Sequence, residues 1–225
     1  MSALTAVAAW TGPIGSDTAA LIRVAPKQDR SALTHGNILD SAAAAIADFG
    51  SLRLTTTIVA EYSECGVGTI YRYFPDRGAI VQALCTRNVD LFLLQCLADI
   101  PHRRHVTWTD SFAAVLQQLQ HFFSREPGFA SVRFGDRFGY GWEADRPKGI
   151  GLVAREISSH LLAAFPGLDK RRLASVVEES LILGEAVLSR AFRETTVGNP
   201  ALLFEAQSIA CSHLERRYGL FEHGS

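Results

Sequence analysis

The residues whose types and spacing suit a chemical task are concentrated between residues 55 and 77. A short apolar-patterned segment opens at Val59, residues 63–65 form a candidate turn, and a second segment covers residues 66–74 until Pro75 closes it. Two short helices joined by a tight turn make the helix-turn-helix pattern, whose second helix enters the major groove of DNA. This stretch therefore predicts a surface that reads double-stranded DNA.

The second segment begins with residues that allow a close approach to DNA. Val67 and Thr69 lie near its start and would face base edges. Gly68, between them, has no side chain that would hold the helix away from the DNA backbone. Gly66 is an acceptable N-cap for this helix but supplies no side-chain acceptor, whereas Thr55 can cap the helix before the turn with its hydroxyl.

The run from Gly68 to Pro75 closely resembles the recognition-helix signature of the TetR family of bacterial transcriptional repressors, and the resemblance is specific over about residues 34–80. The resemblance implies that Tyr71 and Tyr73 donate hydrogen bonds to phosphates, although an isolated cluster of this kind is more often part of a core. The residues expected to contact DNA are Thr55, Thr57, Gly66, Val67, Gly68, Thr69, Tyr71, Arg72, Tyr73 and Arg77.

The stretch also departs from the family pattern. Glu64 stands where the turn glycine is common, and Val67 stands where the recognition helix usually has a lysine, so that Arg72 is its only cation. Arg77 occupies the usual lysine position at the start of the next helix and is expected to meet a phosphate. These departures leave the predicted fold unchanged but give no operator sequence.

The charge balance favours two copies of this domain acting together. The net charge is −1, and the region from Leu21 to Asp90 carries as many Lys and Arg residues as Asp and Glu residues. Because affinity for DNA grows with the number of cations placed on phosphates, one neutral domain should bind weakly. A homodimer is therefore expected.

Apolar residues at helical spacing predict an all-α chain. Residues 1–30 are expected to form a flexible arm, which could follow DNA or be a solvated tail. Residues 31–76 would form a three-helix helix-turn-helix domain, with Thr34 as the first N-cap, and residues 77–225 a helical domain for effector binding and dimerisation. The predicted helices cover about 34–49, 55–63, 66–74, 77–101, 107–125, 129–134, 146–165, 169–195 and 200–218.

The resemblance assigns the last two helices, about 169–195 and 200–218, to a four-helix homodimer interface. Small residues would permit close packing there, or else serve the core of a single chain. These small residues are Gly184, Ala186, Ala191, Ala206 and Ala210.

An aromatic-rich region is the candidate effector site. Binding pockets are largely apolar with few polar anchors, so a lipophilic or aromatic small molecule is expected, while most of these rings would equally suit a core. The candidate residues are Trp108, Phe112, Phe122, Phe129, Phe134, Phe138 and Trp142, with His160 as a polar anchor.

The function implied by the resemblance is a ligand-responsive transcriptional repressor, which binds a palindromic operator as a dimer and is released by an effector. Catalysis is not expected, because the chain has no nucleophile elbow, no Walker-type glycine loop, no HExxH and no carboxylate pair in credible context. The four cysteines lack zinc-like spacing, His102 and His105 lack a further ligand, and no metal or cofactor is expected.

No apolar run approaches the roughly 18–20 residues of a membrane span, which favours a cytoplasmic protein. The rival interpretation is a ligand-binding protein that has lost DNA binding.

Overall fold

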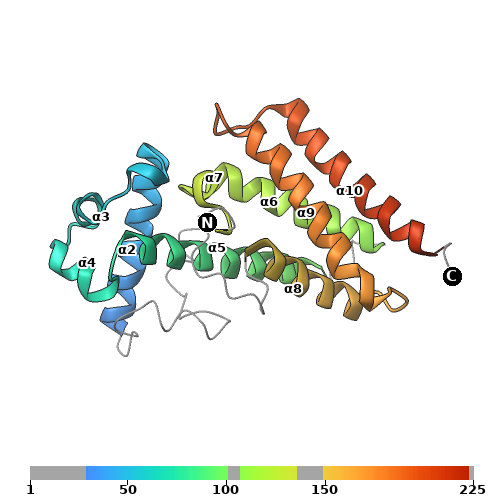
Figure 1. Ribbon diagram of the computed structural model, residues 1–225, viewed down its shortest axis with the longest axis horizontal. Helices are drawn as coiled ribbons and strands as arrows, with labels where there is room; N and C mark the ends of the chain where they lie inside the picture. Colours follow the sequence, from blue (N-terminus) through green and yellow to red (C-terminus); the bar gives the residue numbers. More distant parts are fainter. Residues whose placement is uncertain (1–28, 101–106, 136–148, 223–225) are drawn as a thin grey trace. The chain divides into compact units, whose positions relative to one another are not determined.

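The computed structural model of the protein describes residues 29–100, 107–135 and 149–222 (Figure 1). Every regular element in these residues is a helix, which confirms the predicted all-α fold. The elements are α2 (Asp29–Phe49), the 3-10 turn η2 (Ser51–Arg53), α3 (Thr56–Tyr62), α4 (Val67–Tyr73), α5 (Arg77–Asp99), α6 (Trp108–Arg125), α7 (Phe129–Val132), α8 (Gly149–Ala164), α9 (Lys170–Ala191) and α10 (Pro200–Glu222).

The chain divides into two compact units. The first consists of residues 1–90 with 127–142, and the second of residues 91–126 with 143–225. α5 begins at the residue where the sequence places the start of the second domain, but the division between the units falls inside this helix. α5 therefore contributes residues to both units.

The first helix begins earlier than predicted. α2 starts at Asp29, so residues 29 and 30 are helical and are not part of an arm, and Thr34 lies within the helix and is not its cap. No Gly or Pro interrupts the chain between Asp29 and Thr34, and Ala32 and Leu33 favour a helix. The predicted end is confirmed, because Gly50 takes a positive φ of 79° and its N–H donates to the Ile46 carbonyl.

The core of the first unit is formed by one face of α2 and the helices packed on it. Apolar side chains at helical spacing along α2 are buried together with residues of α3, α4 and the first half of α5. The largest of them are Ile38, Leu39, Ile46, Ile70, Tyr73, Phe74, Ile80 and Leu84. This packing fixes the direction of the short helices α3 and α4, neither of which is long enough to be stable alone.

The segment after α6 packs on α2, although the sequence placed it with the effector region. Gly128 has φ 70°, and a Cβ atom built on it would lie 2.7 Å from the Ala43 carbonyl oxygen. Val132 is buried in the same core, and the Asn88 side-chain amide donates to the Arg133 carbonyl at 2.9 Å. Glycine is favoured at position 128, because the positive φ would strain another residue and the Ala43 carbonyl leaves no space for a Cβ.

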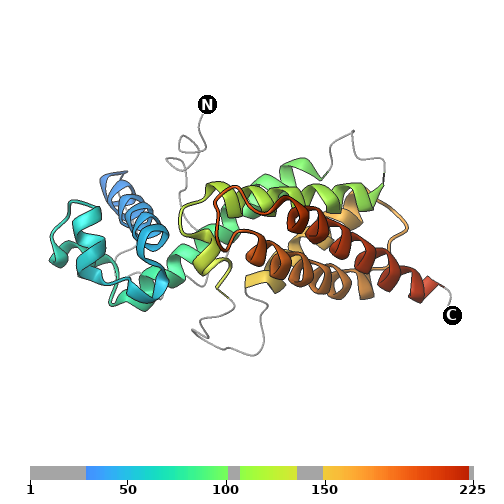
Figure 2. The same ribbon diagram turned by 90° about the horizontal axis from the view of Figure 1, so that it is seen from above.

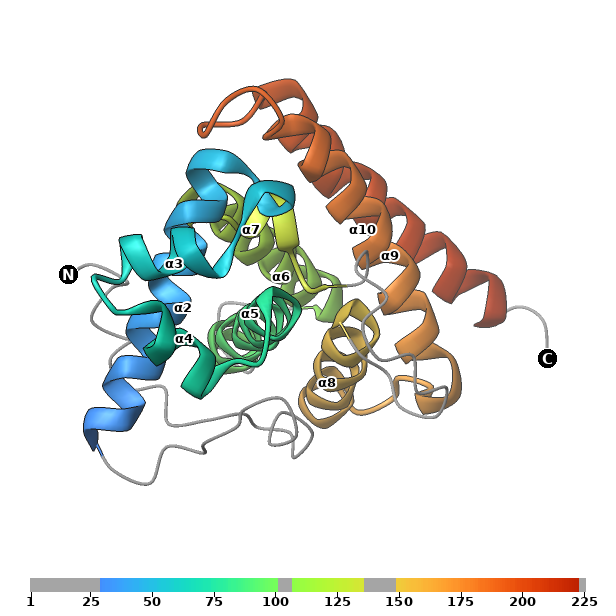
Figure 3. The same ribbon diagram turned by 60° about the vertical axis from the view of Figure 1, so that its left-hand side comes forward.

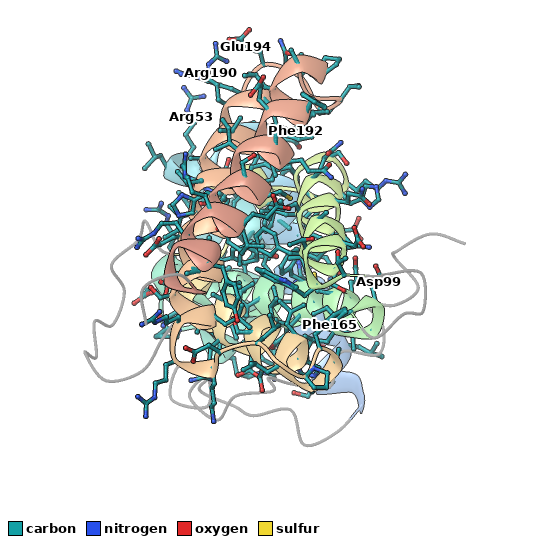
Figure 4. The ribbon with its side chains drawn as sticks, turned by 90° about the vertical axis from the view of Figure 1, so that its right-hand side faces the viewer. Arg53, Asp99, Phe165, Arg190, Phe192 and Glu194 are labelled. Atoms are coloured by element: carbon teal, nitrogen blue, oxygen red, sulfur yellow. The ribbon has the colours of Figure 1, made fainter. Side chains whose placement is uncertain are left out.

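In the second unit, α9 and α10 lie side by side and are joined by a short connection (Figures 1 and 2). The Asp169 side chain caps α9 by accepting from the Arg171 N–H at 2.8 Å. α9 ends at Ala191, four residues before the predicted end, while α10 continues to Glu222, beyond the predicted end at 218. Phe192, which is labelled in Figure 4, follows the end of α9. Its ring stacks on that of Phe123 of α6 with ring centroids 5.6 Å apart.

Among the described residues, α5 is long and apolar enough to cross a membrane by length and composition. Two-thirds of its apolar window, 67%, is buried inside the protein. A helix that serves as the core of a folded protein passes the same test, and α5 has that position here.

Candidate nucleic-acid interface

The first helix of the predicted helix-turn-helix is capped as the sequence indicates. The Thr55 hydroxyl accepts from the Ile58 N–H at 3.1 Å. Thr55 itself is exposed. Thr57, in the first turn of α3, is also exposed. Both residues are accessible to a partner, and their contact with DNA stays a prediction.

The turn between α3 and α4 is a Schellman motif. The Cys65 N–H donates to the Ala60 carbonyl at 3.1 Å, and the Glu64 N–H donates to the Glu61 carbonyl at 3.3 Å. Glu64 takes φ 53°, a conformation that favours glycine. The departure from the family pattern at this position has therefore kept the turn but placed a side chain in a strained backbone.

α2 holds this turn from the other side. The Asn37 side-chain amide donates to the Ser63 carbonyl at 3.1 Å, so a carbonyl at the end of α3 has a partner outside its own helix. Figure 3 shows α3 and α4 beside α2. Sequence reasoning missed Asn37, because its position on α2 gives no sign of which helix end it reaches.

The exposed face of α4 includes a glycine near its centre. Successive helical residues are about 100° apart around the axis, so the side opposite the buried Ile70 is centred between Gly68 and Arg72, with Tyr71 and then Val67 toward one flank. Val67 is 37% exposed and Tyr71 44% exposed. A Cβ atom built on Gly68 would meet nothing within 4 Å. The backbone of α4 is therefore open to a partner along this face.

Gly66 and Thr69 flank this face. Gly66 is the N-cap of α4, has no side-chain cap, and has open space where a Cβ would be. Thr69 is half-buried. Tyr71 is held in place from α3, since its hydroxyl lies 3.1 Å from the Thr56 hydroxyl. Thr56 was not among the predicted site residues.

Tyr73 does not reach the exposed face, and its phosphate contact stays a prediction that this burial does not support. Its side chain is 1% exposed, and its hydroxyl lies 3.1 Å from the Ser31 hydroxyl of α2. The neighbouring Phe74 stacks on His35 with ring centroids 5.1 Å apart. The period of α4 turns Tyr73 toward α2, and it is a core residue that anchors the helix.

The two predicted arginines both have partners within the protein. The Arg72 guanidinium donates to the Tyr73 hydroxyl at 3.2 Å and lies 5.1 Å from the centroid of that ring. Arg77 is half-buried and donates to the Ser51 carbonyl at 2.7 Å, which ties the start of α5 to the turn before α3. Arg77 therefore positions the start of α3, and its predicted contact with a phosphate is not tested by the structure.

A charged pair and a histidine lie behind the interface. Arg87 of α5 lies 2.6 Å from the Asp40 carboxylate of α2. Burial, and then the nearby Arg87 charge, lower the pKa of His35 from 6.5 to about 4. His35 is consequently neutral at physiological pH, and its ring packs within the core.

The predicted effector residues divide between the two units. Phe129 and Phe134 are buried against one another in the first unit, with ring centroids 5.4 Å apart. Trp108, Phe112 and Phe122 lie in the second unit. Phe138 and Trp142 lie outside the described residues. The five described rings therefore do not form one cluster within either unit.

Two of these side chains are tied to other aromatic rings. Trp108 packs on Tyr218 at 4.9 Å between centroids, and Phe122 packs edge-on to Phe92 at 5.3 Å. His160, the predicted polar anchor, has an exposed side chain on α8, and its Nδ1 atom lies 3.0 Å from the Glu156 carbonyl of the same helix. Its role in effector binding stays a prediction.

The small residues of the last two helices pack within the chain. A Cβ atom built on Gly184 would lie 2.9 Å from a Leu116 methyl of α6 and 3.4 Å from the Ala210 Cβ of α10. Ala191 and Ala206 are buried as well, whereas Ala186 is exposed. The alternative of an intrachain core is therefore correct for most of these positions. Exposed apolar side chains lie elsewhere on the two helices, at Ile182, Phe204 and Ile209.

Across the part of the chain that the structure describes, no three His, Cys, Asp or Glu side chains gather as a metal site requires. His102 and His105 lie outside those residues. None of the cysteines is in a disulfide: Cys85 and Cys96 are buried, and Cys65 and Cys211 are half-buried.

Comparison with known proteins agrees with this geometry. Residues 38–84 match the family model of bacterial regulatory proteins of the tetR family. No curated protein matches.

Solved structures with the same fold extend the comparison to most of the chain. A TetR-family transcriptional regulator from Streptomyces coelicolor superposes with a TM-score of 0.68 at 21% identity, covering 81% of this chain and 98% of its own. A TetR regulator from Rhodococcus sp. RHA1 has a TM-score of 0.56 at 20% identity, covering 80% and 94%. SmeT, the repressor of the Stenotrophomonas maltophilia multidrug efflux pump SmeDEF, has a TM-score of 0.54 at 16% identity, covering 82% and 89%.

Proposed function

We propose a function from the premise that this chain belongs to the TetR family, whose DNA-binding domain it carries at residues 38–84. It acts as a cytoplasmic transcriptional repressor that binds a palindromic operator as a homodimer and leaves it when a small molecule binds. The observation that carries this proposal is the exposed face of α4, which is open at Gly68 and flanked by Val67 and Tyr71.

The charges of the first unit explain why a dimer is required. Arg72 and Arg77 both have partners within the protein, so one subunit has few cations available for phosphates. Hydrogen bonds to phosphates from the hydroxyls and N–H groups at the starts of α3 and α4 must supply the rest. Two linked domains place this modest set of contacts on DNA twice.

The second unit supports dimerisation through α9 and α10. Ile182 of α9 and Phe204 and Ile209 of α10 are exposed. Burying one such side chain contributes about 1.5–3 kcal/mol, and a two-fold interface buries each of them twice. These apolar residues, and not the small residues that pack within the chain, are the basis of the proposed interface.

Effector binding is assigned to the second unit. Trp108 is the foremost candidate among the expected residues there, because it is only half-buried, whereas Phe112 and Phe122 are buried. A bound lipophilic or aromatic molecule would favour a conformation with a different spacing of the two α4 helices. Since half-sites on DNA lie about 34–36 Å apart, a small change in that spacing weakens binding. SmeT, which has the same fold, is a repressor of a multidrug efflux pump, and this supports repression.

The test is fluorescence anisotropy of the purified protein on DNA from upstream of its own gene, over a series of salt concentrations. Specific, salt-sensitive binding with two subunits per operator is expected. Tyr71→Phe removes one exposed hydroxyl and should weaken binding about tenfold for the dimer, at roughly 1 kcal/mol or less per hydroxyl.

Tyr62→Phe is the matched control, since Tyr62 is an exposed tyrosine of the same unit whose hydroxyl donates to Asp48. The control should bind as the wild type does. Equal binding by the wild type and Tyr71→Phe would contradict the assigned surface. A confirmed dimer that binds no upstream DNA specifically would favour a ligand-binding protein without a DNA-binding role, the alternative that the missing recognition-helix lysine suggests.

A further inference from the structure

The exposed face of α4 holds few groups that can distinguish one base pair from another. Major-groove readout uses guanidinium or ammonium groups for guanine, amides for adenine, carboxylates for cytosine and apolar groups for the thymine methyl. α4 and its N-cap carry no Lys, Asn, Gln, Asp or Glu. Gly66 and Gly68 contribute no side chain at all.

Two of the remaining side chains are already held by the protein. The Tyr71 hydroxyl lies 3.1 Å from Thr56 of α3. The Arg72 guanidinium lies against the hydroxyl and the ring of Tyr73. For Arg72 to pair with guanine it would have to give up both contacts.

Val67 is therefore the side chain best placed to read a base. It is 37% exposed at the first position of α4, between two glycines whose Cβ positions are open. Its two methyl groups can make only apolar contacts. The one base that presents a methyl group in the major groove is thymine.

We propose that Val67 packs against the C5 methyl group of a thymine in each operator half-site, and that this contact determines the specificity of the protein at that base pair. The inference rests on the proposed DNA-binding function. Thr69 lies on the same segment but is half-buried, so its methyl group is a weaker candidate for the contact.

The experiment uses a series of operators to which the protein binds. In each operator, the thymine at one position of both half-sites is replaced by deoxyuridine, which lacks only the methyl group. Wild-type protein should lose affinity at one symmetric position. The expected loss is about fourfold for each methyl and about fifteenfold for the symmetric pair, from about 0.8 kcal/mol for each buried carbon. Val67→Ala, which removes both γ-methyl groups, should show a clearly smaller loss of affinity than the wild type on replacement of thymine by deoxyuridine.

Leu52→Ala is the matched control, because Leu52 is an exposed apolar residue of the same unit that lies on η2 and not on α4. This variant should keep the full deoxyuridine effect. Wild-type protein that tolerates deoxyuridine at every position overturns the inference while leaving DNA binding intact. A deoxyuridine effect that persists unchanged in Val67→Ala also overturns it, because another residue then reads the methyl group. Failure to bind any operator specifically would instead refute the proposed function on which the inference rests.

Discussion

Replacing Gly68 by alanine should make the protein more stable and bind DNA less tightly. Alanine favours a helix over glycine by roughly 0.5–1 kcal/mol. The added Cβ meets nothing within 4 Å in the protein, so no steric cost offsets this gain. The free energy of unfolding, measured with urea, should rise by about 0.5 kcal/mol or more.

The same methyl group lies near the centre of the exposed face of α4, where it would hold the helix away from DNA. If each subunit loses the equivalent of one hydrogen bond, about 1 kcal/mol, the dimer loses about 2 kcal/mol, which is roughly a thirtyfold weaker Kd. Fluorescence anisotropy on the operator measures this loss. The two effects have opposite signs, so a general loss of folding cannot imitate the result.

Gly36→Ala is the matched control. Gly36 lies within α2, and its Cβ position is also open, so this variant should gain similar stability and keep its affinity for DNA. Gly68→Ala that binds the operator as tightly as the wild type would refute the assignment of this face to DNA. A less stable Gly68→Ala would refute the conclusion that the face is open.

Three further predictions concern the stability of the fold. Glu64→Gly relieves a positive φ of 53° and should raise the free energy of unfolding by about 0.5–1 kcal/mol. The control Glu61→Gly, inside α3, should lower it by a similar amount, and urea unfolding measures both changes. Gly128→Ala should lower the free energy of unfolding by roughly 2–4 kcal/mol, because it adds both backbone strain and a 2.7 Å contact with the Ala43 carbonyl oxygen; the fall in melting temperature measures this loss. Since the pKa of His35 is about 4 in the folded protein against 6.5 when unfolded, the unfolded state binds more protons between these values. Stability should therefore be full above pH 6.5 and fall by at most about 3 kcal/mol toward pH 4, and subtracting the pH profile of His35→Phe from that of the wild type should show this loss.

Local features of the sequence predicted the helices and most of their ends. Thr55, Thr107 and Asp169 cap helices because each has a side-chain oxygen directly before a helical segment, and each accepts a hydrogen bond from a backbone N–H in the first turn. Gly50 ends α2 because it can adopt a positive φ. These interactions join residues that are close in sequence, so the chain alone is sufficient to identify them.

Features that depend on distant contacts were predicted less well. Tyr71 and Tyr73 are two positions apart and chemically alike, yet one is exposed and the other buried, because α2 covers only one side of α4. Gly184 and Ala210 form a pattern that fits an interface between subunits as well as an intrachain contact. In each case the pattern shows that a face is covered, but not which helix covers it.

The contact between Gly128 and α2 has a consequence for exchanging parts of this chain with another protein. The first unit is discontinuous in the chain, since residues 127–135 complete a core that begins with α2. Grafting residues 1–90 onto a different second domain would bring a foreign segment against Ala43 and Ile46, where a Cβ atom has no space. A working chimera must therefore carry both residues 1–90 and residues 127–135 of this chain. Recombination at a single crossover would give a less stable protein wherever the incoming segment lacks a glycine at the position of Gly128.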